Sequence, residues 1–218
     1  MKTAIIGANG KVGTRLGQML AQRGDEAFGF IRKEEQAEEL EKLGMKTVLA
    51  DLIKTDTAEY VSLLKGMDAV VFTAGAGGAG TDLTQAIDGN GLSKMIAAAE
   101  EAGVKRFLLV SAFPDAGRGM GMPESFEFYM KVKRQADVEL AKSSLDWTIL
   151  RPGTLTDEPG TGGVELGLAI PYGEVSRDDV AGVLAELLHN PETTKLILEL
   201  TEGETPISEA VSNQNRPL

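Results

Sequence analysis

Residues 1–13 read MKTAIIGANGKVG, and this stretch decides the fold. The apolar run Thr3–Ile6 is typical of a buried β-strand, and the residues after the turn have the spacing of an amphipathic helix. Three glycines, Gly7, Gly10 and Gly13, lie between the strand and the helix. A helix that begins directly after such a turn directs free N–H groups and a partial positive charge at an anion. The stretch therefore predicts a strand–turn–helix unit that holds nucleotide phosphates.

Each glycine has a separate role in this phosphate cradle. Gly7 permits the tight turn, Gly10 removes a Cβ that would block a pyrophosphate, and Gly13 lets helix and strand approach closely. The spacing is Gly-x-x-Gly-x-x-Gly, which is neither the dehydrogenase Gly-x-Gly-x-x-Gly nor a P-loop. A tight turn without a ligand is the alternative interpretation. The predicted phosphate-binding residues are Gly7, Asn9, Gly10, Lys11, Val12 and Gly13.

Apolar runs and helical patterns alternate along the rest of the chain. The predicted strands are Thr3–Ile6, Ala27–Ile31, Thr47–Ala50, Ala69–Thr73, Arg106–Val110, Trp147–Leu150 and Leu196–Leu200. The predicted helices are Val12–Arg23, Glu34–Leu43, Thr57–Leu64, Gln85–Ala102, Ser125–Lys142 and Arg177–His189. Continuous apolar strands are expected where helices cover both faces of a parallel sheet. The pattern predicts one doubly wound α/β domain over residues 1–218, with three layers (α/β/α) and about seven strands.

Composition excludes several classes of function. The 218 residues include 33 acidic and 22 basic side chains, for a net charge of −11, and no cysteine. Disulfides, thiolate nucleophiles and zinc–thiolate sites are therefore excluded. The negative charge argues against nucleic acids and anionic membranes as partners. No apolar run approaches the ~18 residues of a membrane span, no secretion signal is evident, and no metal-ligand spacing occurs. We expect a cytoplasmic protein that binds small molecules and no metal.

The end of the second predicted strand indicates which dinucleotide is bound. An NAD-binding fold is expected to place Asp or Glu near this point, where it accepts a hydrogen bond from the ribose 2′-hydroxyl. This chain has Arg32 and Lys33 instead. A guanidinium fork suits a 2′-phosphate, and a phosphate approaching an acidic protein needs local positive charge. We therefore predict NADP(H) in preference to NAD(H). The alternative is two solvated charges that begin an acidic helix.

Two further pairs of residues follow predicted strands. Asp51 and Leu52 follow the third strand, where the carboxylate could accept from an adenine amino group and the leucine could pack on the ring. A helix N-cap is the competing role for Asp51. Ala74 and Gly75 follow the fourth strand and are small enough for a cofactor to lie against the backbone. All four are predicted to contact the cofactor.

Three residues suggest proton-transfer chemistry. Ser111 ends the fifth predicted strand, and Tyr129 and Lys133 stand four residues apart on a predicted helix. That spacing places the phenol and the ammonium on one helical face. A neighbouring ammonium is expected to lower the pKa of Tyr129 toward neutrality, and Ser111 could hydrogen-bond a substrate oxygen. The alternative is that Tyr129 and Lys133 are ordinary surface residues of a helix and that Ser111 belongs to a turn. Because they follow a dinucleotide cradle, we predict that these three residues are catalytic.

In this combination, the motifs resemble the short-chain dehydrogenase/reductase superfamily, and specifically its atypical NAD(P)H-binding branch. The resemblance spans nearly the whole chain and implies a Rossmann fold. It further implies that Ser111 orients the substrate, Tyr129 transfers the proton, and Lys133 holds the ribose and tunes Tyr129. Pro152 and Gly153 match the family's Pro-Gly element beside the nicotinamide. Asp88 lies where relatives carry Asn or Asp, and the sequence assigns it no role.

The leading functional hypothesis is an NADP(H)-dependent oxidoreductase that reduces a small carbonyl or oxidises the matching alcohol. Segments 113–124, which contains Met120 and Met122, and 154–175 are expected to supply small substrate-side elements. One alternative is a non-catalytic NADP sensor of the NmrA type that binds a protein partner. An NAD-dependent epimerase or dehydratase is disfavoured by Arg32 and by the short region after the sixth strand. A homodimer is left open.

Overall fold

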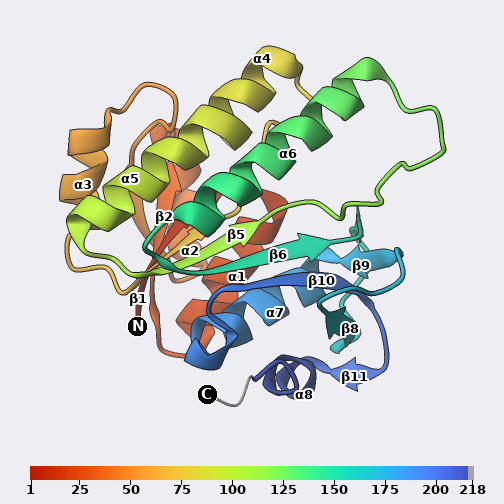
Figure 1. Ribbon diagram of the computed structural model, residues 1–218. Coiled ribbons are helices and arrows are strands. Elements are labelled where there is room, and N and C mark those ends of the chain that lie inside the picture. The colour runs from red at the N-terminus through yellow and green to blue at the C-terminus, as the bar shows by residue number, and fades with distance from the viewer. Residues whose placement is uncertain (216–218) are drawn as a thin grey trace.

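A central sheet of nine strands organises the molecule, in the order β11-β8-β10-β6-β5-β4-β1-β2-β3 (Figure 1). The computed structural model describes residues 1–215. The sheet strands are β1 (Lys2–Ile6), β2 (Glu26–Ile31), β3 (Lys46–Leu49), β4 (Ala69–Phe72), β5 (Arg106–Val110), β6 (Asp146–Pro152), β8 (Gly163–Gly167), β10 (Leu196–Glu202) and β11 (Thr205–Pro206). A separate two-stranded sheet pairs β7 (Thr154–Thr156) with β9 (Glu174–Ser176).

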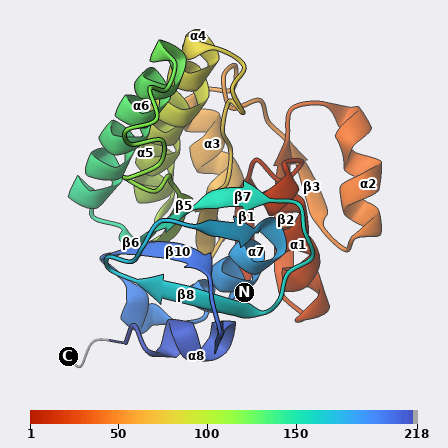
Figure 2. The same cartoon turned by 90° about the vertical axis from the view of Figure 1, so that its right-hand side faces the viewer.

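All seven predicted strands are present, and they form the parallel part of the sheet. The predicted total of about seven is too low, because segment 154–175 adds β7, β8 and β9, and β11 follows β10. β8 runs antiparallel to β10. In β8 the buried Val164 and Leu166 flank the exposed Glu165, so this strand lacks the continuous apolar run of the parallel strands. Figure 2 shows β7 and β8 in front of the parallel strands.

Helices cover both faces of the sheet. Their bounds are α1 (Lys11–Gln22), α2 (Ala37–Lys42), α3 (Thr57–Leu64), α4 (Thr81–Thr84), α5 (Leu92–Ala102), α6 (Glu124–Lys142), α7 (Arg177–Leu188) and α8 (Ile207–Ser212). Shorter turns are the 3₁₀ segments η1 (Glu34–Gln36) and η3 (Pro191–Thr193), and the π-helical η2 (Gln85–Gly91). Within residues 1–215, no helix combines the length and the apolar character that crossing a membrane requires.

One predicted helix, Gln85–Ala102, is divided in the structure. Its first part is the π-helical η2, and only its second part is the α-helix α5. A Cβ on Gly89 would lie 2.6 Å from the side-chain nitrogen (Nε2) of Gln85. A Cβ on Gly91 would lie 2.8 Å from a methyl group of Leu52. Side chains therefore occupy the space that these glycines leave. Such π-helical turns occur frequently at functional sites.

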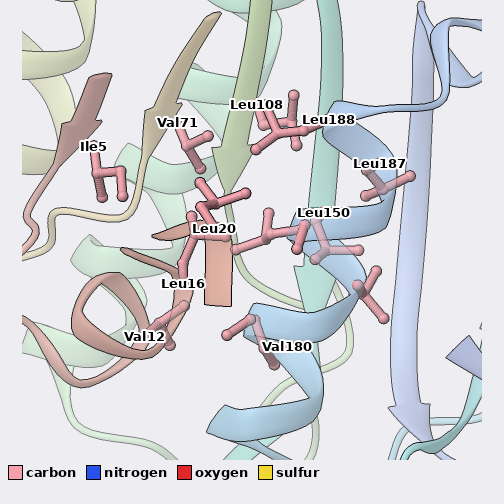
Figure 3. Close-up of a cluster of buried hydrophobic side chains, with 14 of the residues drawn as sticks. Ile5, Val12, Leu16, Leu20, Val71, Leu108, Leu150, Val180, Leu187 and Leu188 are labelled. Carbon is pink, nitrogen blue, oxygen red and sulfur yellow. The ribbon is translucent and has the colours of Figure 1, made fainter. Parts of the chain in front are cut away.

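Two apolar layers bury the sheet. On one face, Ile5, Val71 and Leu108 pack against α1 and α7 (Figure 3). On the other face, Ile6 and Phe72 pack against α3, α5 and α6. Consecutive residues of a strand point to opposite faces, so a strand buried on both faces must be apolar throughout. The predicted three-layer, mostly parallel α/β architecture is confirmed.

Candidate functional site

The glycine turn between β1 and α1 forms an open cradle. Gly7 has a φ of +91°, and a Cβ there would lie 2.6 Å from the backbone nitrogen of Ala74. A Cβ on Gly13 would lie 2.4 Å from the carbonyl oxygen of Gly7. Gly10 donates its backbone N–H to the same oxygen at 2.9 Å, and it lines the cavities on both sides of the turn. The turn therefore brings backbone, without side chains, to the place where a phosphate would bind.

A cavity of about 430 Å³ extends from the cradle along the ends of β2 and β3. Eight of the predicted cofactor residues line it, namely Gly7, Asn9, Gly10, Arg32, Asp51, Leu52, Ala74 and Gly75. Phe30, Ile31 and Ile53 add apolar surface suited to a purine ring. Lys33 is exposed. Neither Lys33 nor Gly13 lines this cavity or any of the three cavities described below. This cavity can accommodate the adenosine half of a dinucleotide.

The backbone around Arg32 is held by a residue that the sequence analysis missed. The side-chain oxygen of Gln36 accepts hydrogen bonds from the backbone N–H groups of Arg32 at 3.1 Å and Lys33 at 3.2 Å. Gln36 also lines the cavity. Gln36 stands three residues after Lys33, as the Gln of a capping box would, but Lys33 has no acceptor with which to complete the box, so the sequence signal was weak.

Asp51 stabilises a turn at the cavity wall. Its Oδ1 accepts a hydrogen bond from the backbone N–H of Ile53 at 2.9 Å. The alternative role as a helix N-cap is wrong, because the N-cap of α3 is Asp56, which accepts from the N–H of Glu59 at 2.8 Å. The second carboxylate oxygen of Asp51 lies 3.9 Å from the Lys54 ammonium. Asp51 thus shapes the turn while it lines the cavity.

A second cavity, of about 540 Å³, lies on the other side of the cradle. Four residues line both cavities, namely Gly10, Thr73, Ala74 and Gly75. Lys11 and Val12, predicted to bind phosphate, line the second cavity only. Two cavities that meet at a phosphate cradle match the two nucleosides of a dinucleotide. The arrangement fits the cofactor that the sequence predicts.

The three predicted catalytic residues meet in this second cavity. Ser111 is buried, and its Oγ has no hydrogen-bond partner within residues 1–215. Tyr129 is half-buried on α6, and Lys133 follows one turn later. The Lys133 ammonium donates a hydrogen bond to the Val110 carbonyl at 2.9 Å and lies 3.5 Å from Asp88 Oδ1. A buried hydroxyl without a hydrogen-bond partner destabilises a folded protein, so Ser111 is suited to a ligand that accepts a hydrogen bond from it.

The pKa of Tyr129 shifts in the direction opposite to the one that the sequence predicts. Burial, with smaller contributions from the negative charges of Asp88 and Asp137, raises the pKa of Tyr129 to about 12. The Lys133 ammonium is directed at Asp88 and the Val110 carbonyl, and Asp88 offsets its charge. The expectation that Lys133 lowers this pKa toward neutrality is therefore wrong for this arrangement. Tyr129 is a protonated phenol at neutral pH.

Asp88, to which the sequence assigned no role, connects two parts of the site. It lies on the π-helical η2, and its Oδ1 faces the Lys133 ammonium. Its Oδ2 accepts a hydrogen bond from the backbone N–H of Ala76 at 2.9 Å. The carboxylate therefore joins the face of α6 that carries Lys133 to the glycine-rich loop after β4.

A third cavity, of about 400 Å³, adjoins the second at Ser111 and Tyr129. The predicted cofactor residues Pro152 and Gly153 line this cavity rather than the other two. Its remaining walls come mainly from the two expected substrate-side segments and α6, and include Phe113, Met120, Met122, Phe126, Met130, Leu155 and Tyr172. The rings of Phe113 and Tyr172 meet edge to face, with centroids 5.2 Å apart. This predominantly apolar cavity begins beside Ser111 and Tyr129.

The sequence analysis also missed a cluster of charges beside the cradle. Arg177, the first residue of α7, lines the second cavity. Its guanidinium lies 3.0 Å from Asp157 Oδ1, and the other oxygen of Asp157 pairs with Lys11. The position of Arg177 at a helix start gave no signal, because its contacts come from distant parts of the chain. Within residues 1–215, no group of three acidic or histidine side chains is placed to hold a metal ion.

The mostly parallel sheet, the glycine cradle and the paired cavities define a dinucleotide-binding protein with a Rossmann-like fold. The chain belongs to the NAD(P)H-binding family, whose profile matches residues 7–191. This match, with the structural relatives below, confirms the resemblance to the atypical short-chain branch. Family membership alone does not determine which reaction a protein catalyses.

Three similar proteins illustrate the family. A Bacillus subtilis protein named as an uncharacterized sugar epimerase is 42% identical over 213 residues, covering 97% of this chain and 99% of that protein. A solved Bacillus halodurans structure, named with the NAD-dependent epimerases/dehydratases, has a TM-score of 0.90 and 38% identity, with coverage of 98% and 99%. The Lactococcus lactis oxidoreductase ylbE has a TM-score of 0.84 and 30% identity, with coverage of 98% and 96%. The family is thus one of oxidoreductase and epimerase-like proteins.

Proposed function

We propose that the protein is an NADP(H)-dependent reductase of small carbonyl compounds. The observation that carries this proposal is the meeting of Ser111, Tyr129 and Lys133 in a cavity that shares its walls with the phosphate cradle. Ser111 and Tyr129 also line the apolar third cavity, where a substrate could lie. Both residues thus line the cavity on the cofactor side and the cavity on the substrate side.

The bound cofactor would supply the hydride, and the residues of the chain would control the oxygen of the substrate. The Ser111 hydroxyl, which has no partner within residues 1–215, would donate a hydrogen bond to the carbonyl oxygen. Tyr129 would then transfer its phenolic proton to the same oxygen as the alcohol forms. Its raised pKa keeps that proton in place at neutral pH, whereas alcohol oxidation would need the phenolate. The protonation state of Tyr129 at neutral pH is therefore the one that the reductive direction needs.

Positive charges support the preference for NADP(H). Arg32 lines the adenosine-side cavity, where a 2′-phosphate could reach its guanidinium. In calorimetric titrations, the wild-type protein should bind NADPH more tightly than NADH. Arg32→Ala should remove most of that difference, whereas Lys33→Ala, outside the cavity wall, should retain it. Equal affinity of the wild-type protein for the two cofactors would refute the assignment.

Tyr129→Phe tests the catalytic proposal directly. The variant should bind NADPH with nearly unchanged affinity and lose turnover by about 10²–10⁴-fold, the usual contribution of a proton-transfer group. Tyr172→Phe is the matched comparison, because its hydroxyl contacts Thr154 Oγ1 at 2.7 Å and lies in the third cavity only. That change should alter KM rather than abolish turnover. Full turnover in Tyr129→Phe would remove Tyr129 from its proposed role.

The names of two relatives favour a second candidate, an NAD-dependent epimerase. An epimerase would convert a sugar substrate without net consumption of cofactor, whereas a reductase oxidises one NADPH per turnover. Monitoring NADPH absorbance together with product formation separates the two activities. Tight NADPH binding without turnover of any substrate would instead support the cofactor-sensor interpretation.

A further inference from the structure

A fourth cavity lies beside the third and differs from it in charge. It measures about 350 Å³, and its walls include Arg118, Glu127 and Arg134. Four residues line both cavities, namely Ala116, Gly117, Met122 and Met130. The apolar third cavity and the charged fourth cavity are therefore neighbours with shared walls.

Arg134 is an exposed cation in the wall of this cavity. It follows Met130 by one helical turn and Glu127 by two turns, so the three side chains form one stripe along α6. Within residues 1–215, Arg134 makes no ion pair, whereas Arg118 pairs with Asp115 at 2.8 Å. The five N–H donors of its guanidinium are suited to a planar carboxylate.

The shared walls can let a long ligand pass. Met122 and Met130 are flexible side chains that adapt to different shapes. Gly117 has a φ of +70°, and a Cβ there would lie 2.5 Å from Met122 Cγ and 2.8 Å from the Phe126 ring. The absence of a side chain at Gly117 leaves the room in which Met122 and Phe126 lie. Because Met122 and Met130 line both cavities and can change rotamer, an apolar chain in the third cavity could extend past them toward Arg134.

We propose that the substrate of this reductase is an amphipathic carbonyl compound with a carboxylate at the end distant from the carbonyl. The apolar body would occupy the third cavity, and Arg134 would bind the carboxylate in the fourth. Glu127 in the same wall and the net charge of −11 both repel an anion, so a local guanidinium is needed to bind one. The inference rests on the proposed reductase function and specifies its substrate class.

A pair of ligands that differ only in charge tests the subsite. The protein, saturated with NADP⁺, is titrated calorimetrically with 6-phenylhexanoate and with the neutral 6-phenylhexanamide. The carboxylate should bind at least about tenfold more tightly, as expected for charge-assisted hydrogen bonds. Arg134→Gln should remove that preference. Lys131→Gln is the matched control, because Lys131 is an exposed cation on the same helix that lines none of the four cavities.

The subsite proposal is overturned if neither ligand binds or if the acid and the amide bind with equal affinity. It is also overturned if the preference for the acid survives Arg134→Gln, or if Lys131→Gln removes that preference to the same extent. The reductase proposal is tested by a separate measurement. The acid–amide comparison is repeated without NADP⁺, and NADPH oxidation is followed with ω-oxo acids and their methyl esters. An Arg134-dependent acid preference without turnover would refute the reductase function and retain the anion subsite.

Discussion

The Lys133 ammonium lies 3.5 Å from the Asp88 carboxylate, and both side chains are almost wholly buried, with 5% and 1% exposed. Asp88 uses its second oxygen to hold the backbone of Ala76 at 2.9 Å. A buried ion pair with an added hydrogen bond positions both partners, although its net contribution to stability is small. In this protein the pair aligns α6, which carries Tyr129, with the loop after β4.

Asp88→Asn should destabilise the protein and change the acidity of Tyr129. Removing one partner leaves Lys133 buried beside a neutral group, which costs about 3 kcal/mol in the free energy of unfolding. The pKa of Tyr129 should fall, because the charge of Asp88 is one of the causes that raise it. Urea denaturation measures the first effect and phenolate absorbance the second. Asp82→Asn, at an exposed position of α4, should change neither quantity.

The raised pKa of Tyr129 predicts how stability depends on alkaline pH. In the unfolded chain the phenol ionises near its ordinary pKa of about 10, whereas in the folded protein its pKa is about 12. The contribution of the neutral phenol is therefore complete below about pH 10 and is lost as pH rises toward 12. The free energy of unfolding of the wild-type protein should fall over this range more steeply than that of Tyr129→Phe. Parallel curves for the two proteins would contradict the raised pKa.

Asp157 should compete with the cofactor for the cations beside the cradle. It pairs with both Lys11 and Arg177, and Arg177 lines the second cavity. Asp157→Asn should therefore bind NADPH more tightly, by about two- to tenfold for exposed charges. Arg177→Ala should bind it more weakly. Calorimetry at low and high salt measures both effects, and an unchanged affinity in Arg177→Ala would exclude a phosphate contact by that residue.

Alanine substitutions at two glycines distinguish the effect of backbone strain from the effect of a steric clash. Gly7 and Gly24 have similar φ values of +91° and +86°, but only Gly7 has backbone atoms within 3 Å of a built Cβ. Gly24→Ala should lower the free energy of unfolding by about 1–2 kcal/mol, the cost of left-handed backbone for alanine. Gly7→Ala should add about 1–3 kcal/mol from the contact with Ala74. Thermal unfolding compares them, and equal losses would exclude the clash.

Much of the fold could be predicted because its signals are local. The strand, glycine turn and helix at residues 1–22 follow from apolar periodicity and from a backbone that accepts positive φ at Gly7. The parallel strands were predicted because burial on both faces requires apolar side chains at successive positions. Strands β7, β8, β9 and β11 were not predicted. Strands β7, β9 and β11 have only two or three residues each, and β8 has glycines at both ends and alternating burial, so their patterns are weak.

Residues that follow strands could be assigned to the candidate site, since the carboxyl ends of parallel strands meet at one edge of a sheet. The amino-acid sequence therefore suffices for the cradle, Arg32 and the positions of Ser111 and Tyr129 along the chain. Pairing between distant segments depends on the folded chain. Asp88 meets Lys133 and Asp157 meets Arg177 only after the helices have packed. The acidity of Tyr129 also depends on the tertiary structure, because burial in the folded protein is the largest cause of its raised pKa, and Asp88, which adds to it, comes from another part of the chain.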